Sequence, residues 1–574
     1  MKKVKKIAEK KTWRVKKIVH ANFTVQNLHP VVLQILVSRG YNTAEKIEHF
    51  LYPDFERDLH DPFLFVEMEK VVARITKAQK EKEVVGIFGD HDVDGISGTT
   101  ILSETLDELG IKSIAYIPDK HAEGHGISEK GIETFAKAGA TLMLTVDCGV
   151  SNILEVTQAK KRGMDVIIID HHSVPKVLPD AFAIINPQLD NAGYPFKDLC
   201  GTGAAFKVAT ALYRRLLPEK IEQLKWLLDI AAIGTIADVM PLYGENRTLT
   251  KYGLLVLSKT RRIAFQEMIT VGRIPIDENH IPDARMIAFH IAPRLNAAGR
   301  MGKAQDAFDF LIEKDRVRAR SRALDLEAKN KERQKITDEL VREVHIIAEE
   351  KKDKQSIIAI AEHFPIGIIG IVAGRMASQY GKPTGVFHKG AKESRGSFRS
   401  IPAVNIIRVL EKCSRHLVKF GGHHQAAGAT ITNKNFPAFE KNFHKAVEDE
   451  LAEENLLQEL IIDAEISSQD VDFALAQQIR KCAPFGQGNV EPLFLLRNLC
   501  VDDLRWVGNG NKHVKLLLHA DGSPKTFDAI GFGFGNEFSH LTVGAMVDAV
   551  CTIEENEWNG TTALQLNLVD IQII

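Results

Sequence analysis

The densest group of chemically useful side chains is a run of three aspartates at alternate positions. Asp90, Asp92 and Asp94 stand in the stretch Asp-His-Asp-Val-Asp-Gly, directly after an apolar segment. Carboxylate oxygens are the ligands that hard divalent cations prefer in proteins. A calcium loop of the EF-hand type is disfavoured, because its twelfth position requires glutamate and is Ile101 here, and because a predicted strand rather than a helix precedes the run. The run therefore predicts a divalent-metal site of another kind.

Further residues of the same ligand types follow other apolar segments: Asp147, Asp170, His171, His172 and Asp238. Any single one of them could simply cap a helix. Together they are too rich in carboxylates for one zinc ion, and they match a pair of Mn²⁺ or Mg²⁺ ions about 3.5 to 4 Å apart that deprotonate a bridging water to hydrolyse phosphate esters or anhydrides. Neither a P-loop nor a Gly-x-Ser-x-Gly elbow is present, so P-loop nucleotide hydrolysis and serine-hydrolase chemistry are not supported.

Parallel β-strands are predicted to position these side chains. Short apolar runs rich in β-branched residues alternate with helical patterns, as in a parallel α/β sheet whose strands are buried on both faces. Three of the runs end on Asp90, Asp147 and Asp170. Because ligands bind at the carboxyl ends of parallel strands, we expect these aspartates at one edge of the sheet. The predicted strands cover residues 84–89, 113–118, 141–146, 165–169 and 181–186.

Length and periodicity predict several domains around this sheet. The chain has 574 residues, which is more than one hydrophobic core usually organises. Helical spacing runs from about 27 to 80, and the absence of Gly and Pro from 303 to 364 predicts one long connecting helix or two with a break. A second α/β domain is predicted from about 355 to 450, with the glycines from 367 to 374 at a turn and helix start, and a small β-barrel after it.

Charge and cysteine content indicate the cellular compartment of the protein more clearly than its binding partners. Lys plus Arg number 74 and Asp plus Glu 75, so a surface for nucleic acid must come from local clustering. The first 20 residues hold nine basic residues and one acidic residue, and this arm could touch nucleic acid or remain a solvated terminus. Six scattered cysteines without a Cys-x-x-Cys pair favour a reducing cytoplasm, and the lack of an uncharged apolar stretch of about 18 residues predicts a soluble protein.

The metal motifs resemble those of the DHH phosphoesterase superfamily, which is named after its Asp-His-His tripeptide. Within it, the chain resembles the RecJ family of bacterial single-strand-specific exonucleases over nearly its whole length. The resemblance implies an α/β fold, in which a parallel-sheet DHH domain is joined by a long helix to a DHHA1 α/β domain, followed by a C-terminal OB-like β-barrel. Beyond the metal motifs, the resemblance is carried by Arg39-Gly40, Asp61–Phe63, Gly234–Leu242, Pro293–Met301, Gly367–Arg375, Gly421–Gly428 and Pro484–Asn489.

The resemblance also implies boundaries for the domains of the chain. The expected division is an N-terminal helical and basic segment at 1–80, a DHH catalytic domain at 81–302, a connecting long helix at 303–354, a DHHA1 substrate-binding domain at 355–450 and an OB-fold-like nucleic-acid-binding domain at 451–574.

By position, the resemblance implies that two divalent ions, Mn²⁺ or Mg²⁺, bind five side chains and that Asp147 bridges them. The implied ligands are Asp92, Asp94, Asp147, His171 and Asp238. Catalytic roles beside the ions fall to Asp90, Asp170 and His172, with Asp170 orienting its histidine neighbours rather than binding metal. His91 stands where Tyr or Phe is usual in the family, and a second histidine, His424, follows His423. Either could add an off-pathway metal contact.

The DHHA1-like lobe is expected to hold the terminal phosphate and the nucleotides behind it, because glycines admit backbone amides to phosphate oxygens and arginines offer forked donors. Arg300 and Arg375 could instead form salt bridges between the lobes, and Gly421-Gly422 could be a plain turn. Phe398 replaces a more usual small residue, which leaves the conformation of its loop open. The implied binding positions are Arg300, Gln334, Arg375, Ser397, Arg399 and His423. In the barrel, the residues that could contact a single strand, or else form rim and core, are Trp506, Lys512, His513 and Lys515.

These features predict a metal-dependent 5′→3′ exonuclease that hydrolyses single-stranded DNA to 5′-mononucleotides in DNA repair and recombination. Residue types and spacing alone predict only a two-metal phosphoesterase on an α/β sheet. The 5′→3′ direction of cleavage and the preference for DNA are implied by the resemblance. One alternative is a superfamily member acting on short oligonucleotides, cyclic dinucleotides or pyrophosphate, against which the extra barrel argues. Another is a catalytically silent DNA-binding scaffold, against which the complete set of carboxylates argues. A single-strand-binding protein and a helicase are implied partners, and a monomer is expected.

Overall fold

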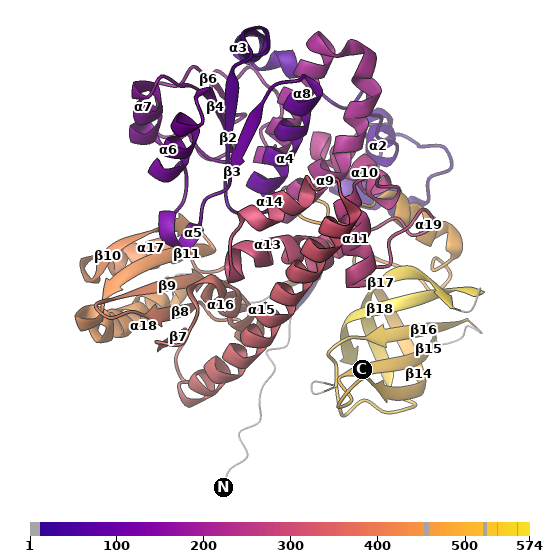
Figure 1. Ribbon diagram of the computed structural model, residues 1–574. Coiled ribbons are helices and arrows are strands. Elements are labelled where there is room, and N and C mark those ends of the chain that lie inside the picture. The colour runs from indigo at the N-terminus through magenta and orange to yellow at the C-terminus, as the bar shows by residue number, and fades with distance from the viewer. Residues whose placement is uncertain (1–11, 453–458, 521–524, 536–537, 559–560) are drawn as a thin grey trace. The chain divides into compact units, whose positions relative to one another are not determined.

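A computed structural model describes most of the chain, which divides into two compact units (Figure 1). We call the first the barrel unit; it comprises Met1–Leu59, Pro241–Lys251 and Leu457–Ile574. The second, the two-sheet unit, comprises His60–Met240 and Tyr252–Leu456. The described residues are 12–452, 459–520, 525–535, 538–558 and 561–574. Most of the basic N-terminal arm therefore lies outside the described residues.

The helical spacing near the N-terminus yields three α-helices that belong to different units. In the barrel unit, Pro30 starts α1 (Pro30–Ser38), and the Thr43 side chain accepts a hydrogen bond from the Lys46 amide to begin α2 (Ala44–Leu51). Helix α3 (Met68–Glu81) lies in the two-sheet unit. The predicted helical pattern is thus confirmed as secondary structure.

A five-stranded parallel sheet forms the first half of the two-sheet unit, as predicted. Its strand order is β3-β2-β4-β5-β6. Residues Gly89, Val146, Ile169 and Ile185 stand side by side in register at the carboxyl ends of four strands. The next residue after each of the first three is an aspartate, so the sheet brings all three aspartates to one edge. The strands are β2 (Val84–Gly89), β3 (Ser113–Tyr116), β4 (Ala140–Val146), β5 (Asp165–Ile169) and β6 (Ala183–Ile185).

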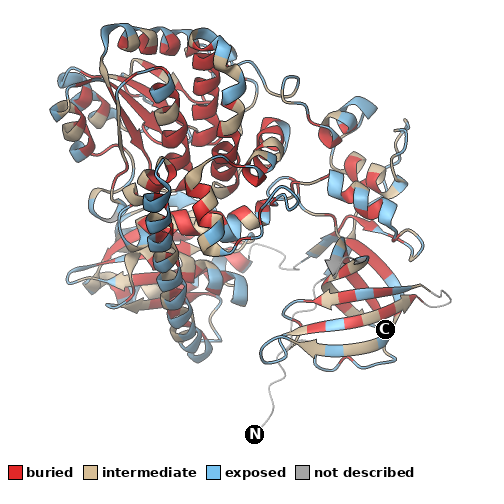
Figure 2. Ribbon diagram, turned by 45° about the vertical axis from the view of Figure 1, so that its right-hand side comes forward, coloured by how far each residue is buried: buried red, intermediate tan, exposed pale blue. Residues whose placement is uncertain are grey.

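Helices cover both faces of this sheet (Figure 1). On one face, α6 (Glu129–Lys137) and α7 (Ile153–Lys161) bury Phe135 and Val156 against the strands. The other face is covered by α4 (Val93–Glu108) and α8 (Gly201–Leu216). Most of the sheet and the inner faces of these helices are buried (Figure 2). Burial on both faces explains why the strands appear in the sequence as continuous apolar runs.

The Gly- and Pro-free stretch forms two helices with a break. The first is short, α14 (Gln305–Leu311), and the second is the 35-residue α15 (Arg316–Glu350). Asp315 caps α15 by accepting a hydrogen bond from the Arg318 amide. The sequence left both possibilities open, and the capping aspartate accounts for where the second helix begins.

The second half of the two-sheet unit is a mixed sheet in the order β10-β11-β9-β8-β7, where only β7 and β8 are parallel. Helix α16 (Ile366–Tyr380) and α15 share one core with β7 and β8. Helices α17 (Ile406–Lys412) and α18 (Phe436–Ala452) share another core, on the opposite face. The strands are β7 (Ile357–Ala361), β8 (Thr384–Lys389), β9 (Glu393–Arg399), β10 (Leu417–His423) and β11 (Ala426–Thr432).

The glycines from 367 to 374 agree with the prediction only in part. Helix α16 starts at Ile366, so the predicted helix start is confirmed, but Gly370 and Gly374 lie inside the helix rather than at a turn. A Cβ at Gly370 would stand 3.0 Å from the Ser397 hydroxyl, and one at Gly374 would stand 3.7 Å from Arg399. Their small size thus lets α16 approach the end of β9, which is a packing requirement that single-sequence patterns do not distinguish from a turn.

The barrel unit holds a closed five-stranded barrel, as predicted. β14 (Phe494–Val507) pairs with both β15 (His513–Ala520) and β17 (Met546–Trp558), and β16 (Thr526–Gly531) and β18 (Thr561–Ile573) complete the ring. Helices α1, α2 and α19 (Phe473–Lys481) contribute to its hydrophobic core. β1 (Thr12–Val15) pairs in parallel with β12 (Glu459–Ile462) beside β13 (Ala464–Glu465). The six cysteines are free thiols. No helix among the described residues has the length and apolar character needed to cross a membrane.

Arg247 joins three distant segments of the barrel unit. Its guanidinium donates hydrogen bonds to the carbonyl oxygens of Phe50, Lys481, Cys482 and Ala483 at 2.8–3.1 Å. It also lies 3.8 Å from the centre of the Phe50 ring. The residue is only 2% exposed, and burial lowers its pKa to about 10. All four carbonyl groups would lose their donor together if this side chain were shortened.

We predict that Arg247→Met lowers the free energy of unfolding of the barrel unit by at least about 3 kcal/mol, because it leaves several buried carbonyls unsatisfied. Denaturant unfolding followed by the near-UV signal of the barrel tryptophans measures this. Arg505→Met is the matched control: that side chain is 76% exposed, and its loss should cost less than about 0.5 kcal/mol. Equal losses for the two variants would contradict the role assigned to Arg247.

Candidate metal centre

Three aspartates extend the hydrogen-bond ladder of the parallel sheet by one residue. The Asp90 amide donates to Val146 O at 3.1 Å, the Asp147 amide to Ile169 O at 2.9 Å and the Asp170 amide to Ile185 O at 3.0 Å. The backbone of each aspartate is therefore held in place before its side chain makes any contact. These are the three strand-end residues that the sequence predicted at one edge.

Asp92 and Asp94 are oriented by helix N-termini. Asp92 caps α4 and accepts hydrogen bonds from the amides of Asp94 at 3.0 Å and Gly95 at 3.4 Å. Both carboxylate oxygens of Asp94 accept amides from the first turn of α8, at 2.7 Å from Gly201 and 2.8 Å from Thr202. These amide contacts fix the orientation of both carboxylates at the N-termini of two helices, positions that favour negatively charged groups.

His171 is the point on which the carboxylates converge. Its Nε2 lies 3.0 Å from Asp147 Oδ1, 3.7 Å from Asp94 Oδ2 and 3.6 Å from Asp238 Oδ2. Asp238 reaches this point from the C-terminal end of α9 (Leu228–Ala237). A second group of ligand atoms, from Asp90, Asp92 and Asp147, also lies within 4.8 Å. The fold thus brings together all five side chains predicted as ligands, with Asp147 common to both groups.

Electrostatic repulsion inside this cluster is strong. Burial, together with the neighbouring carboxylates, raises the pKa of Asp147 well above its ordinary value and that of Asp92 as well. The same causes raise the pKa of Asp238 to about 8. Burial lowers the pKa of His171, which leaves a neutral imidazole able to bind a metal. A buried, oxygen-rich set with one imidazole fits Mn²⁺ or Mg²⁺, and such a cation would relieve the repulsion.

Asp170 contacts the two histidines rather than the other carboxylates. Its Oδ1 accepts the amides of His171 at 2.7 Å and His172 at 3.1 Å and lies 2.8 Å from His172 Nδ1. Its Oδ2 accepts the Val150 amide at 3.0 Å. The hydrogen bond with Asp170 raises the pKa of His172 to about 9, so this half-exposed imidazole carries a proton at neutral pH.

One proposed ligand and one residue next to a ligand adopt left-handed backbone conformations. Asp147 has a φ of 60° and Val239, which follows Asp238, has a φ of 57°. For a β-branched residue such as Val239 this is a true outlier, and its side chain is 66% exposed, so apolar burial does not compensate. Sequence reasoning missed Val239, because nothing about valine indicates a positive φ.

A group of basic side chains lies near the acidic cluster. Desolvation and the neighbouring guanidiniums of Arg333 and Arg399 lower the pKa of Arg300. Desolvation and Arg300 lower the pKa of Lys120, which also feels the charges of Asp90 and Asp92. Cations held close enough to repel each other favour binding of an anion between them. The sequence had indicated Arg300 and Arg399 but missed Lys120 and Arg333, which distant segments bring to the same place.

The remaining predicted binding residues have mixed surroundings. Arg300 donates to Gly367 O at 3.0 Å and Arg399 to Ser397 Oγ at 3.3 Å, while Arg375 pairs with Asp338 on α15. This ion pair joins α16 to α15 within one core, so it is not the salt bridge between the lobes that the sequence had left open for Arg375. Gln334 on α15 and His423 on β10 are exposed, and His423 does not occur in the groups of possible metal ligands found among the described residues.

The stretch around Phe398 is a strand rather than a loop. Residues 393–399 form β9, and Phe398 is fully buried between Phe387 and Phe443. Gly421-Gly422 likewise belongs to a strand, β10, and not to a plain turn. An aromatic residue at 398 therefore fills the hydrophobic core of the second sheet and leaves its neighbours Ser397 and Arg399 half-buried.

The four candidate residues of the barrel lie on or between β14 and β15. Lys512 and Lys515 are exposed. Trp506 is partly buried against the barrel core, and His513 accepts the Gly533 amide at 3.0 Å. The two lysines thus remain available to a ligand, whereas Trp506 and His513 also have structural contacts.

Comparisons with known proteins agree with this architecture. Family models match residues 84–235 (DHH family, N-terminal domain), 346–453 (DHHA1 domain) and 462–570 (RecJ OB domain). Single-stranded-DNA-specific exonuclease RecJ of Bacillus subtilis is 34% identical over 96% of this chain and 69% of its own length. The protein of the same name from Haemophilus influenzae is 31% identical over 94% of this chain and 96% of its own length.

A solved structure of a protein with the same name also resembles this chain. The crystal structure of RecJ in complex with Mn²⁺ from Thermus thermophilus matches with a TM-score of 0.83 and 25% identity, covering 98% of this chain and 79% of that chain. The metal bound by that protein is of the kind that the donor set described here fits.

We predict that Gly201→Ala weakens Mn²⁺ binding roughly 10- to 100-fold, as loss of a supporting contact does at other metal sites. A Cβ at this position would lie 2.6 Å from Asp147 Cβ and 3.0 Å from Asp94 Oδ2, so both ligands must move. Isothermal titration calorimetry measures the affinity. Gly374→Ala is the control, because its added Cβ meets nothing closer than 3.7 Å. Unchanged affinity in Gly201→Ala would show that this close approach does not position the ligands.

We also predict that Mn²⁺ binding at pH 7 releases protons, because Asp238, with a pKa of about 8, must lose its proton to bind. The apparent affinity should therefore rise as the pH increases from 6 to about 8. Calorimetry in buffers of different ionisation enthalpy counts the protons. Asp238→Asn should release fewer of them, and exposed Asp190→Asn should release as many as the wild type. Affinity independent of pH over this range would contradict the raised pKa.

Proposed function

The chain belongs to the RecJ family of single-stranded-DNA-specific exonucleases, and we propose that it degrades single-stranded DNA from the 5′ end to 5′-mononucleotides. It is a metal-dependent phosphodiesterase of the DHH type. The observation that carries this proposal is the convergence of four carboxylates and His171 at the carboxyl edge of the parallel sheet. DNA repair and recombination are the processes in which such an activity would act.

The proposal assigns two divalent ions to the cluster. Asp94, Asp238 and His171 supply ligand atoms for one ion, and Asp92, with Asp90 beside it, supplies atoms for the other. Asp147 lies 3.0 Å from His171 and also belongs to the group with Asp90 and Asp92, so it is the proposed bridge. When bound, the ions would lower the pKa of an attacking water and neutralise negative charge that develops on the phosphate. The number of ions and the choice between Mn²⁺ and Mg²⁺ are part of the proposal.

His172 and Asp170 form the proposed proton-handling pair. Asp170 holds Nδ1 of His172 at 2.8 Å and keeps the imidazole charged at neutral pH. A charged imidazole at the edge of the cluster can donate a hydrogen bond to a phosphate oxygen and stabilise the negative charge that grows on it in the transition state. Asp170 is thus proposed as a positioning residue and His172 as the residue that meets substrate.

The neighbouring basic residues are proposed to bind the strand's terminal phosphate and backbone. Arg300, Arg399 and Lys120 lie near one another beside the acidic cluster, and Ser397 contacts Arg399. Gln334, Arg375 and His423 are proposed to contact nucleotides farther along. The RecJ-type OB barrel, with exposed Lys512 and Lys515, suits a single strand. The division into five domains, the partnership with a helicase and a single-strand-binding protein, and a monomeric state stay predictions.

We predict that Asp147→Asn lowers the rate of single-strand degradation on the order of 10³-fold or more, because it removes the carboxylate common to both ligand groups. Single-stranded DNA labelled separately at each end, incubated with Mn²⁺ or Mg²⁺, measures both the rate and the polarity. Asp190→Asn is the control, since Asp190 is exposed and outside the cluster.

The expected result is release of mononucleotides from the 5′ end of single strands, with duplex DNA and pyrophosphate left intact. A long strand that is bound but not cut would contradict the catalytic assignment and favour a DNA-binding scaffold. Hydrolysis confined to pyrophosphate or dinucleotides would contradict the substrate assignment.

A further inference from the structure

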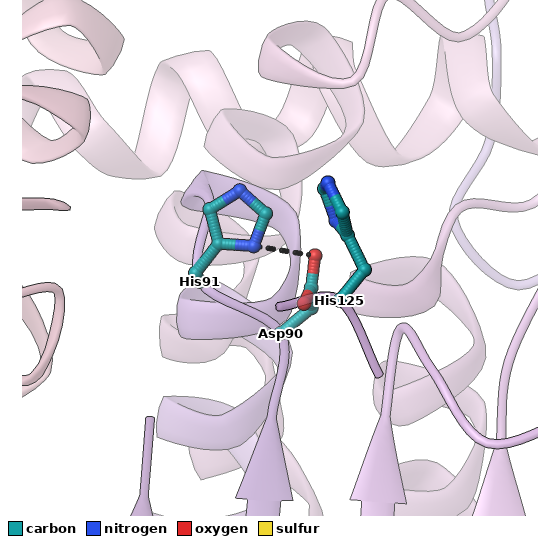
Figure 3. A group of neighbouring side chains, drawn as sticks. All are labelled: Asp90, His91 and His125. Carbon is teal, nitrogen blue, oxygen red and sulfur yellow. Dashed lines mark ion pairs between the residues drawn. The ribbon is translucent and has the colours of Figure 1, made fainter. Parts of the chain in front are cut away.

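A second group of metal-ligand atoms lies beside the acidic cluster (Figure 3). The imidazoles of His91 and His125 stand on either side of the Asp90 carboxylate. His91 Nδ1 lies 3.0 Å from Asp90 Oδ2, and the two imidazole centres are 5.0 Å apart at an interplanar angle of 70°. One ligand atom from each of the three residues falls within 4.8 Å of the other two. Neither histidine belongs to the five ligands assigned above.

Buried polar atoms in this group lack partners. Asp90 is only 8% exposed, and its Oδ1 has no hydrogen-bond partner among the described residues. His91 Nδ1 is also buried, and among the described residues its polar neighbour is the Asp90 carboxylate, 3.0 Å away, with which it is poorly aligned for a hydrogen bond. Leaving a buried donor or acceptor unsatisfied is destabilising. A cation held between a carboxylate and a neutral imidazole would satisfy both atoms at once.

The spacing suits a tetrahedral transition ion. With metal–ligand bonds of about 2.0–2.1 Å, the ligand atoms of a tetrahedral zinc site lie about 3.4 Å apart. The observed separations, from 3.0 Å up to the 4.8 Å limit, bracket that value. His125 is exposed and lies between Gly124 and Gly126, both with positive φ, which leaves the group open to solvent on one side. An open fourth position and a path of entry are therefore both present.

We propose that Asp90, His91 and His125 bind an additional divalent ion of the zinc type, and that this ion inhibits the nuclease. Two imidazoles and one carboxylate favour Zn²⁺ over Mg²⁺ or Mn²⁺, whereas the oxygen-rich cluster suits the latter. Asp90 also contributes to the group formed with Asp92 and Asp147. An ion that draws the Asp90 carboxylate toward the two imidazoles removes it from that group and adds a positive charge next to it. The inhibitory effect rests on the proposed nuclease function, but the binding site does not.

The binding test uses a background that isolates this site. Cys500, Asp502 and His519 on the barrel also place ligand atoms within 4.8 Å, so all proteins carry Cys500→Ser. The acidic cluster is saturated with excess Mg²⁺, and bound Zn²⁺ per chain is then measured by equilibrium dialysis and elemental analysis. His91→Phe and His125→Gln each remove one nitrogen ligand, and exposed His290→Gln is the matched control. Circular dichroism and thermal unfolding verify that each variant is folded.

We expect the background protein and His290→Gln each to bind one Zn²⁺. His91→Phe and His125→Gln should bind this ion about 100-fold more weakly or not at all, because loss of a direct ligand weakens binding at least as much as loss of a supporting contact. Equal Zn²⁺ binding by all four proteins would overturn the site. His125→Gln alters an exposed side chain, so it provides this result even where His91→Phe fails to fold.

The regulatory part has its own measurement. Zn²⁺ should inhibit Mg²⁺-dependent degradation of single-stranded DNA in the background protein, and the inhibitory concentration should rise at least tenfold in His91→Phe and His125→Gln, with the activity in Mg²⁺ alone retained. Identical inhibition in the variants would overturn the regulatory role. A chain that binds Zn²⁺ as predicted but never cuts DNA would refute the nuclease function and leave the zinc site standing, so the two failures are distinguishable.

Discussion

Mutual repulsion of buried carboxylates is the constraint on which this structure depends. Asp147, Asp92 and Asp238 all have raised pKa values because burial and neighbouring negative charge act together on them. The fold holds them in place through the sheet ladder and the N-termini of α4 and α8. These backbone contacts come from the protein itself and position the carboxylates independently of the contacts that a metal would add.

The same repulsion links metal binding to stability. The pKa of Asp238 is about 8 in the folded protein, far above that of an unfolded carboxyl group. Without a cation, the folded state therefore holds a proton that the unfolded state has lost, and its stability falls as the pH rises from about 4 to about 8. Bound cations reverse the sign of this contribution, because they bind the ionised carboxylates of the folded state alone. The left-handed backbone at Asp147 and Val239 adds a further cost to the folded state.

Much of the parallel sheet and of its ligand edge could be predicted because both are local in sequence. Continuous β-branched runs ending in aspartate specify a buried parallel strand and its functional end, as at Asp90 and Asp147. Contacts that depend on tertiary packing could not be predicted from local sequence patterns. Lys120 and His125 join the site from segments with no distinctive pattern, the positive φ of Val239 contradicts the preference of its side chain, and Gly370 serves helix packing rather than a turn.

Charge of both signs at one edge decides which ligand this fold can take. A carboxylate cluster alone would repel a phosphate, and a basic cluster alone would repel the metal. Lys120 feels Asp90 and Asp92 on one side and Arg300 and Arg399 on the other, so it lies where the two clusters meet. Under the proposed function, a phosphodiester would contact bound cations and the fixed basic residues together once the cations have neutralised the carboxylates. Electrostatics then favours metal binding before binding of the strand.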